Sequence, residues 1–205
     1  MTPPQAESKK IRYEMRSRRR ALDPGLRADA AASMASLVAG LPAYQSARNI
    51  AAYAAVDGEM DAAALLLQAE HDGKRVYMPV LPAKQPQALQ FHAWTPAVRM
   101  RENRLHIPEP EAVAASGIDP QSLDLVLVPL VAFDRVGNRL GMGAGYYDRT
   151  FAFLKQAGRK PLLLGLAYEF QRVERLTAAS WDVPLAGVAT ESHVYWFAGR
   201  QPQQP

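Results

Sequence analysis

Short apolar runs alternate along this chain with segments of helical periodicity. The longest apolar run covers residues 125–133, is rich in Val and Leu, and is interrupted only by Pro129. A second covers residues 161–167. Short aliphatic runs of this kind are typical of strands that are buried on both faces of a sheet. Further strands are predicted at 49–55, 75–81, 89–95 and, more weakly, 186–190.

Helical periodicity and capping residues occupy the intervals between these strands. Asp23 and Pro24 fit the N-cap and first position of a helix, and Gly40 and Pro42 fit its end. Asp61 fits the cap of another helix. The predicted helices cover residues 8–22, 24–39, 61–70 and 146–156.

Alternating strands and helices predict a parallel sheet, because a strand–helix–strand unit normally joins two parallel strands, through a right-handed crossover. We therefore expect one α/β domain over residues 1–205, a three-layer α/β/α sandwich around a mostly parallel sheet. Residues 100–120 are predicted to be loop with short turns, and residues 1–7 and 199–205 to be loose tails. Ligands of such sheets bind beyond the carboxyl ends of the strands.

The segment RLGMGAGYYDR, which begins at Arg139 and ends at Arg149, combines alternating glycines with charge. Gly141, Gly143 and Gly145 would let backbone amides approach an anion. The amino end of the following helix has unpaired amides, and arginines add bidentate hydrogen bonds to phosphate. The segment therefore predicts a phosphate-binding loop, and the alternative is a flexible turn that begins a core helix.

Two carboxylates fit a metal ion beside this loop. Asp148 lies in the first turn of the predicted helix, and Asp182 lies in the sequence WDVP. Mg²⁺ typically takes one or two carboxylates together with phosphate oxygens and water, although Asp182 alone would be an ordinary loop acid.

The glycine spacing matches neither a Walker P-loop nor a dinucleotide fingerprint. The histidines lack metal-site spacing, and no serine lies in a G-x-S-x-G turn.

Composition excludes several classes of function. The chain has no cysteine, so thiolate chemistry, disulfides and cysteine-based zinc sites are excluded. No apolar run approaches the roughly 20 residues that cross a bilayer. The first residues lack the apolar core of a signal peptide. We therefore expect a cytoplasmic protein without a membrane partner.

The net charge of +4 is unevenly distributed. Seven basic residues and one acid lie between Lys9 and Arg20. Such a block favours nucleic acid, an acidic surface or a polyanionic small molecule, and a solvated helix face is the alternative.

Glu59 follows a predicted strand at a crevice-facing position, where its carboxylate could accept paired N–H donors of a ring. The alternative for Glu59 is a helix-capping acid beside Asp61.

The segment RLGMGAGYYDR, preceded by VPLVAFD, resembles the signature of the 5-formyltetrahydrofolate cyclo-ligase family, also called 5,10-methenyltetrahydrofolate synthetases. KKIRYEMRSRRRAL, YAAVDGEMDAAALL and IPEP are similar to further segments of this family, so the resemblance covers most of the chain. It implies conversion of 5-formyltetrahydrofolate to 5,10-methenyltetrahydrofolate, with ATP as co-substrate and Mg²⁺. We expect a monomer that acts on these small molecules and has no nucleic-acid partner.

The resemblance also assigns residues by position. For ATP, Arg12 matches, and Lys9 or Lys10 would replace a lysine that the family places where this chain has Ser8. The rest of the implied ATP segment is Arg139, Leu140, Gly141, Met142, Gly143, Ala144, Gly145, Tyr146 and Tyr147. The implied folate site is Ala54, Glu59, Met142, Gly143, Ala144, Gly145 and Tyr146. The implied Mg²⁺ ligands are Asp148 and Asp182, and the implied catalytic residues are Arg139, Tyr146 and Arg149.

Three positions depart from the family pattern. Ala54 stands where relatives usually have a larger apolar residue, Ala144 where bacterial relatives usually have glycine, and Ala186 where many relatives have an additional aspartate. In the implied chemistry the formyl oxygen attacks the γ-phosphate and N10 then closes the ring, which requires mainly positioning and charge neutralisation. Two alternatives stay open: an RNA-binding protein led by the basic helix, and another ATP-dependent kinase or ligase.

Overall fold

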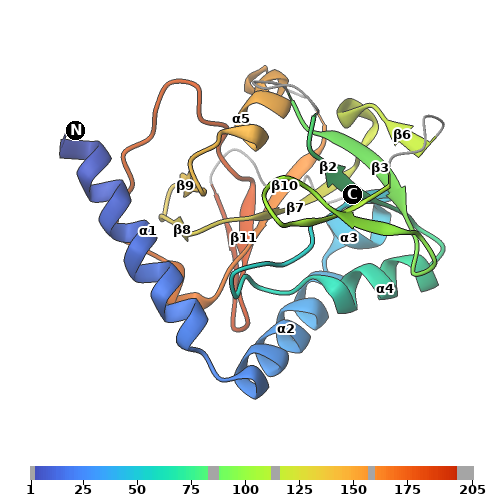
Figure 1. Cartoon of the computed structure of the whole chain (residues 1–205), viewed down its shortest axis with the longest axis horizontal. Helices are drawn as coiled ribbons and strands as arrows, with labels where there is room; N and C mark the ends of the chain where they lie inside the picture. The colour runs from blue at the N-terminus through green and yellow to red at the C-terminus, as the bar shows by residue number, and fades with distance from the viewer. Residues whose placement is uncertain (1–2, 83–87, 112–115, 157–159, 198–205) are drawn as a thin grey trace.

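The centre of the fold is an eight-stranded sheet in the order β12-β11-β10-β7-β1-β2-β3-β6 (Figure 1). The computed structural model describes residues 3–82, 88–111, 116–156 and 160–197. Its strands are β1 (Asn49–Ala51), β2 (Arg75–Val80), β3 (Gln90–Trp94), β6 (Gly117–Ile118), β7 (Leu125–Pro129), β10 (Leu162–Leu166), β11 (Gly187–Ala189) and β12 (Val194–Trp196). The five central strands are parallel, whereas β3, β6 and β12 pair antiparallel at the edges. The prediction of a mostly parallel sheet is confirmed.

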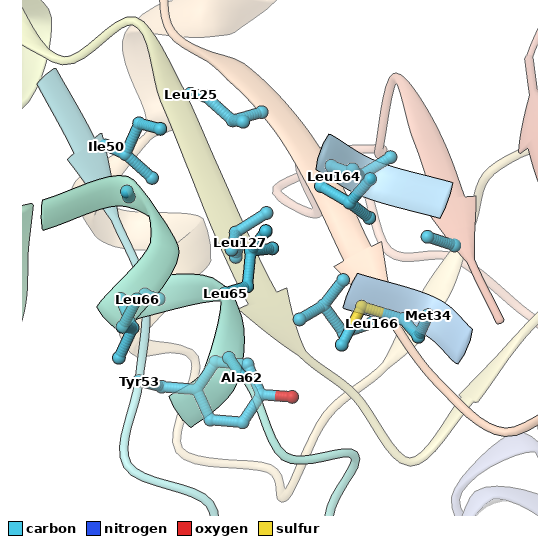
Figure 2. Packing of buried hydrophobic residues seen from close by; sticks show 14 of the residues in the cluster. Met34, Ile50, Tyr53, Ala62, Leu65, Leu66, Leu125, Leu127, Leu164 and Leu166 are labelled. Carbon is cyan, nitrogen blue, oxygen red and sulfur yellow. The ribbon is translucent and has the colours of Figure 1, made fainter. Parts of the chain in front are cut away.

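Successive residues of β7 point to opposite faces of this sheet. Leu125 and Leu127 belong to the core beneath the helices on one face, and Figure 2 shows Leu127 beside Leu65. Val126 and Val128 belong to the core on the other face. The helices are α1 (Pro3–Ala21), α2 (Pro24–Ala39), α3 (Pro42–Ser46), α4 (Ala63–His71) and α5 (Tyr146–Thr150), with 3₁₀ turns η2 (Pro120–Ser122), η3 (Ala152–Lys155) and η4 (Glu169–Gln171).

Helices α2, α3 and α4 cover one face, and α5, η3 and loops cover the other, which gives the expected three layers. The cap of α2 is as predicted, because the Asp23 carboxylate accepts the amides of Gly25 and Leu26. Helix α1 begins at Pro3, so the predicted tail is wrong for residues 3–7, while residues 198–205 lie outside the described residues. No helix in the described ranges is both long and apolar enough to span a bilayer.

The prediction of a loop over residues 100–120 is wrong. Strands β4 (Met100–Glu102) and β5 (Pro108–Pro110) form an antiparallel pair, and β6 joins the main sheet. The prolines of β5 are tolerated because they lie in a two-stranded ribbon, where one edge of the strand needs no ladder hydrogen bond.

Other predicted elements differ from the structure in extent or in order. Strand β1 ends at Ala51, and the run 125–133 divides into β7 and β8 (Ala132–Phe133), which pairs with β9 (Arg139–Leu140). The predicted helix 146–156 divides into α5 and η3. Strand β11 is not the last strand, because β12 follows it.

Gly187 on β11 has no room for a side chain. A Cβ there would lie 2.6 Å from the Tyr195 carbonyl oxygen and 2.8 Å from the Trp196 ring. We expect Gly187→Ala to lower the free energy of unfolding in urea by about 1–3 kcal/mol, because backbone atoms must move to admit the methyl group. Gly117→Ala on β6 is the control, since its nearest contact would be an ordinary 3.8 Å. Equal effects of the two substitutions would contradict this explanation.

Candidate active site

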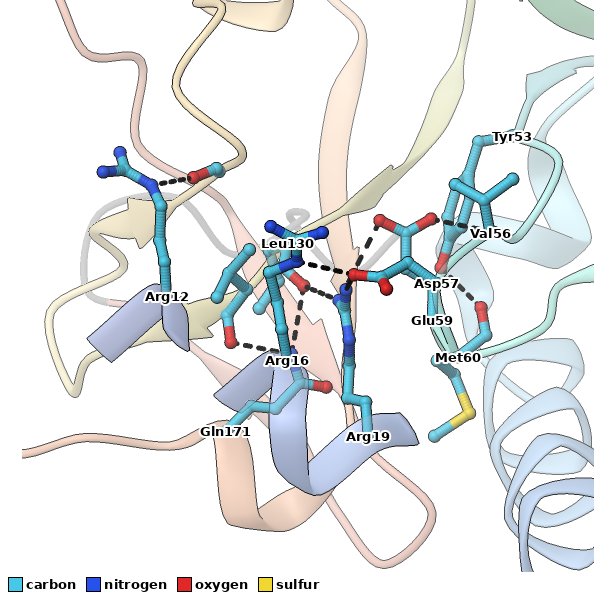
Figure 3. Close-up of polar contacts among 12 residues, drawn as sticks. Arg12, Arg16, Arg19, Tyr53, Val56, Asp57, Glu59, Met60, Leu130 and Gln171 are labelled. Carbon is cyan, nitrogen blue, oxygen red and sulfur yellow. Dashed lines mark hydrogen bonds and ion pairs between the residues drawn. The ribbon is translucent and has the colours of Figure 1, made fainter. Parts of the chain in front are cut away.

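Helix α1 and the glycine loop 141–145 lie against each other. Arg12 Nε donates a 2.8 Å hydrogen bond to the Gly141 carbonyl oxygen (Figure 3), and a Cβ at Gly143 would lie 3.6 Å from Arg12 Nη2. Leu140, just before the loop, packs with Met15 of α1 in a small apolar cluster. The structure therefore brings together Arg12 and the loop, which are separated by about 130 residues in sequence.

The glycine loop presents unoccupied hydrogen-bond donors. Gly143 has φ 103° and Gly145 has φ 65°, left-handed conformations that favour glycine. Within the described residues, no hydrogen bond is found from the amides of residues 141–145 to another protein group. The loop is open to solvent, and Met142 is 51% exposed. Helix α5 has only five residues and therefore a small dipole, so an anion here would be bound by loop amides rather than by a helix end.

Arg139 and Asp148 form an ion pair at the base of the loop. Arg139 Nη2 donates to Asp148 Oδ1 at 2.9 Å, and Arg139 Nη1 donates to the Val183 carbonyl oxygen at 2.9 Å. The Arg139 side chain is only 6% exposed. Two of its donors are thus used inside the protein, and a phosphate contact from Arg139 stays a prediction. Arg149 is nearer the opening, where Nη2 donates to the Ala144 carbonyl oxygen at 2.8 Å.

Asp148 and Asp182 lie on neighbouring segments. Besides Arg139, Asp148 Oδ1 accepts the Val183 amide at 3.0 Å, which places it next to the backbone of Asp182. Asp182 Oδ2 accepts the Ala179 amide at 2.8 Å. No group of three or more acidic or histidine ligands is found in the described part of the chain. Two carboxylates fit Mg²⁺ only if phosphate oxygens and water complete its coordination, as is usual for this ion.

Glu59 lies in a tight turn after β1 and is largely buried, with 10% of its side chain exposed. Its Oε2 accepts the Val56 amide at 3.2 Å, and its Oε1 lies 3.9 Å from Arg19 Nη1 (Figure 3). Burial raises the pKa of Glu59, and the positive charge of Arg19 opposes that increase. This environment is that of a largely buried, ion-paired carboxylate rather than of a solvated helix cap.

Two tyrosines connect Glu59 with the segment that follows the glycine loop. Burial, and then the negative charge of Glu59, raise the pKa of both Tyr53 and Tyr147. Tyr147 belongs to α5, so Glu59 lies close to the helix that follows the loop. Ala54 is half-buried against the core.

Tyr146 has a partner that the sequence did not indicate. Its hydroxyl accepts a hydrogen bond from Arg104 Nη2 at 2.9 Å, and Arg104 Nη1 donates to the Pro82 carbonyl oxygen at 2.8 Å. The Arg149 guanidinium lies 5.1 Å from the centre of the Tyr146 ring. Arg104 follows β4 in the segment that was predicted to be loop, and its sequence context gave no sign of this contact.

Most of the basic residues in α1 have partners inside the protein. Of the seven between Lys9 and Arg20, five contact other elements: Arg12, Arg16, Arg18, Arg19 and Arg20. Lys9 and Lys10 are exposed, and Lys10 lies 3.8 Å from Glu14. The structure therefore gives no reason to choose between the two lysines for ATP, and it leaves few basic side chains for nucleic acid.

Comparisons with known proteins show the family to which this chain is related. A family model described as the 5-formyltetrahydrofolate cyclo-ligase family matches residues 4–191. The chain is 38% identical over 181 residues to 5-formyltetrahydrofolate cyclo-ligase of Escherichia coli (strain K12), which covers 88% of this chain and 98% of the relative. The enzyme of the same name from Haemophilus influenzae is 38% identical over 175 residues, which covers 85% of this chain and 92% of the relative.

Solved structures show the same fold. The NMR structure of Aquifex aeolicus 5,10-methenyltetrahydrofolate synthetase superimposes with a TM-score of 0.78 at 28% identity, over 97% of this chain and 96% of that one. A 5,10-methenyltetrahydrofolate synthetase from Mycoplasma pneumoniae, 24% identical, shares the fold with a TM-score of 0.69, over 90% of this chain and 98% of that one. With the matching family model and these relatives, the chain belongs to the 5-formyltetrahydrofolate cyclo-ligase family.

Proposed function

We propose that this protein catalyses the ATP- and Mg²⁺-dependent cyclisation of 5-formyltetrahydrofolate to 5,10-methenyltetrahydrofolate, with release of ADP and phosphate. The observation that carries the proposal is the open glycine loop, whose amides at 141–145 have no partner in the described ranges. Arg12 contacts this loop, and Tyr147, which follows the loop, lies close enough to Glu59 for the carboxylate to raise the pKa of its hydroxyl. The same family relatives bear this activity in their names.

In the proposed reaction, the loop amides and Arg12 bind the ATP phosphates, and the Glu59 carboxylate accepts N–H groups of the pterin ring. The formyl oxygen attacks the γ-phosphorus and ADP leaves. N10 then attacks the formyl carbon, and the phosphate that is expelled takes up the N10 proton as the ring closes. Asp148 and Asp182 would hold Mg²⁺, which neutralises phosphate charge when bound. The protein supplies mainly position and electrostatics, so a general base is not required.

The neighbours of the site suggest roles for its other residues. Arg149 is exposed beside the loop and adds positive charge where phosphate charge develops. The Tyr146 hydroxyl accepts a hydrogen bond from Arg104, and this contact joins the end of the loop to the ribbon of β4 and β5. We expect the enzyme to act on these small molecules as a cytoplasmic monomer.

The direct test is spectrophotometric. Purified protein is mixed with 5-formyltetrahydrofolate and Mg-ATP, and the near-ultraviolet absorbance of the methenyl product is followed. We expect an absorbance increase that requires ATP and is abolished by EDTA and restored by excess Mg²⁺. No ATP-dependent increase would contradict the proposal, whereas an increase that survives EDTA would contradict only the role of the metal.

Arg12 provides a more specific test of the nucleotide site. We expect Arg12→Met to raise the KM for ATP roughly tenfold, because a charge-assisted contact to phosphate is worth about 1.5–3 kcal/mol and solvent access reduces it. The KM for folate should change little. Arg18→Met is the matched control, since Arg18 lies on the same helix but stacks 4.3 Å from the Phe170 ring. An ATP KM that is equal in both variants would remove Arg12 from the nucleotide site.

A further inference from the structure

Three arginines of α1 lie on one face of the helix and point toward the site. Arg12, Arg16 and Arg19 are spaced i, i+4 and i+7, which is the spacing of one helical stripe. Arg12 contacts the glycine loop, whereas Arg16 and Arg19 contact the turn that carries Glu59 (Figure 3). Arg19 is 0% exposed, and a fully buried arginine is rare unless its charge is paired.

The Arg19 guanidinium is held by the end of β7 and by the turn. Its Nη1 donates to the Leu130 carbonyl oxygen at 3.2 Å, and its Nη2 donates to Asp57 Oδ2 at 3.1 Å. The same Nη1 lies 3.9 Å from Glu59 Oε1. Its Nε is buried and has no hydrogen-bond partner among the described residues. Leaving a buried donor unpaired is unfavourable, so the other contacts of the guanidinium must hold Arg19 in this position.

The turn that carries Glu59 is fitted closely to α1. Asp57 (φ 54°) and Gly58 (φ 72°) are both left-handed, and the Glu59 amide donates to the Val56 carbonyl oxygen at 3.0 Å, which closes the turn. A Cβ at Gly58 would lie 3.0 Å from the Arg19 carbonyl oxygen. The backbone of the turn therefore rests on the helix at the same residue whose side chain reaches Glu59.

We propose that Arg19 is a positioning residue of the folate site, whose buried guanidinium keeps the Glu59 carboxylate ionised and directed toward the ring of the substrate. The inference rests on the proposed function, because it assumes that Glu59 accepts N–H donors of the pterin. A carboxylate accepts such a pair of donors only when it is deprotonated and suitably oriented. Arg19 does not touch the substrate and acts through Glu59.

Removing the positive charge of Arg19 should change the pKa of Glu59 in a definite direction. Burial raises the pKa of Glu59 and Arg19 lowers it, so loss of Arg19 raises the pKa of Glu59 further. Glu59 then becomes protonated at a higher pH, and folate binding is lost at a higher pH on the acid side. The charged or titratable groups that face Glu59 are Arg16 and Arg19 of α1, Asp57 of the turn, Tyr53 after β1 and Tyr147 of α5.

The test compares Arg19→Met with Arg20→Met. Arg20 also pairs with Asp57 but is 55% exposed and has no recorded contact with Glu59 in the described part of the chain, so it controls for loss of a cation from the turn. The titration of Glu59 is followed by ¹³C NMR of labelled carboxyl groups, assigned with Glu59→Gln, and the KM for folate is measured against pH.

We expect Arg19→Met to raise the Glu59 titration midpoint by about one pH unit or more, as is typical for loss of an opposite charge at this distance. The acid limb of the folate kcat/KM profile should move with it, and the folate KM at neutral pH should rise about tenfold. The ATP KM should change little. Arg20→Met should leave the midpoint in place, and a midpoint unmoved by Arg19→Met would overturn the inference.

Arg19→Lys keeps the inference testable if Arg19→Met does not fold. The lysine retains the charge but loses the planar contacts, so we expect a smaller increase in the folate KM, about threefold. That increase should disappear in a Glu59→Gln background if Arg19 acts through Glu59. Persistence of the increase in that background would overturn the inference. The NMR titration requires no turnover, so an inactive wild-type enzyme would contradict the proposed function while the Glu59 titration still decides the role of Arg19.

Discussion

Glu59→Gln should raise the KM for 5-formyltetrahydrofolate by about 100-fold, because a charge-assisted pair of hydrogen bonds worth about 3 kcal/mol is lost. Glutamine keeps the shape of the side chain and can still accept the Val56 amide. It cannot accept two N–H donors with both terminal atoms, and it leaves the fully buried Arg19 without part of its counter-charge. The ATP KM should stay within about twofold, since Glu59 is not expected to contact the nucleotide.

The measurement is a pair of steady-state titrations, one in folate at saturating ATP and one in ATP at saturating folate. Glu70→Gln serves as a matched control, because Glu70 is an exposed acid of the neighbouring helix α4. Thermal unfolding of both variants separates loss of folded protein from loss of binding. An unchanged folate KM in folded Glu59→Gln would remove Glu59 from the folate site, and with it the proposed role of Arg19.

The central strands were predictable because both of their faces pack against the apolar core. Residues 125–128 are buried on both faces, so no alternation with polar residues is needed, and the run is too short for a helix. The cap at Asp23 was predictable for a local reason, since the carboxylate bonds to amides only two and three residues away. Where a structural cause lies within a few residues of its effect, the sequence is sufficient.

The elements that were missed have distant causes. Glu109 of β5 is buried and accepts the Leu81 amide at 2.8 Å, which holds the ribbon of β4 and β5 to the end of β2. It also accepts Arg101 Nη2 at 3.0 Å, which joins β5 to β4. Periodicity within residues 100–120 does not reveal these partners. Likewise, the basic block of α1 favoured a solvated face or a polyanion, whereas Asp57 is its main partner and lies roughly 40 residues away.

In the candidate site too, features with local causes were predictable from the sequence, and features with distant causes were not. The glycine spacing and nearby arginines indicated an anion-binding loop, and the unpaired amides of 141–145 agree with that prediction. The spacing could not show that Arg139 uses two donors on Val183 and Asp148, because this depends on how the segment after η4 folds back. Nor could it show that Arg104 contacts Tyr146 across 42 residues.

Asp148→Asn should lower kcat at moderate Mg²⁺ by about 100-fold or more and raise the Mg²⁺ concentration for half-maximal activity, because a metal ion supplies several kcal/mol of charge stabilisation in phosphoryl transfer. Asparagine keeps an oxygen that accepts the Val183 amide and Arg139 Nη2. It removes the negative charge, however, and leaves the largely buried Arg139 without a counter-ion. A modest loss of thermal stability should therefore accompany the loss of activity.

Two comparisons separate the metal effect from the structural one. Asp182→Asn lies on the neighbouring segment and does not contact Arg139 in the described ranges, so it should raise the Mg²⁺ requirement, by about tenfold, with little change in thermal unfolding. Glu174→Gln alters an exposed ion pair with Arg135 and should change neither quantity. If Asp148→Asn lowered stability but left the Mg²⁺ requirement unchanged, Asp148 would be the structural partner of Arg139 alone, and the metal would have to be held by the phosphates and Asp182.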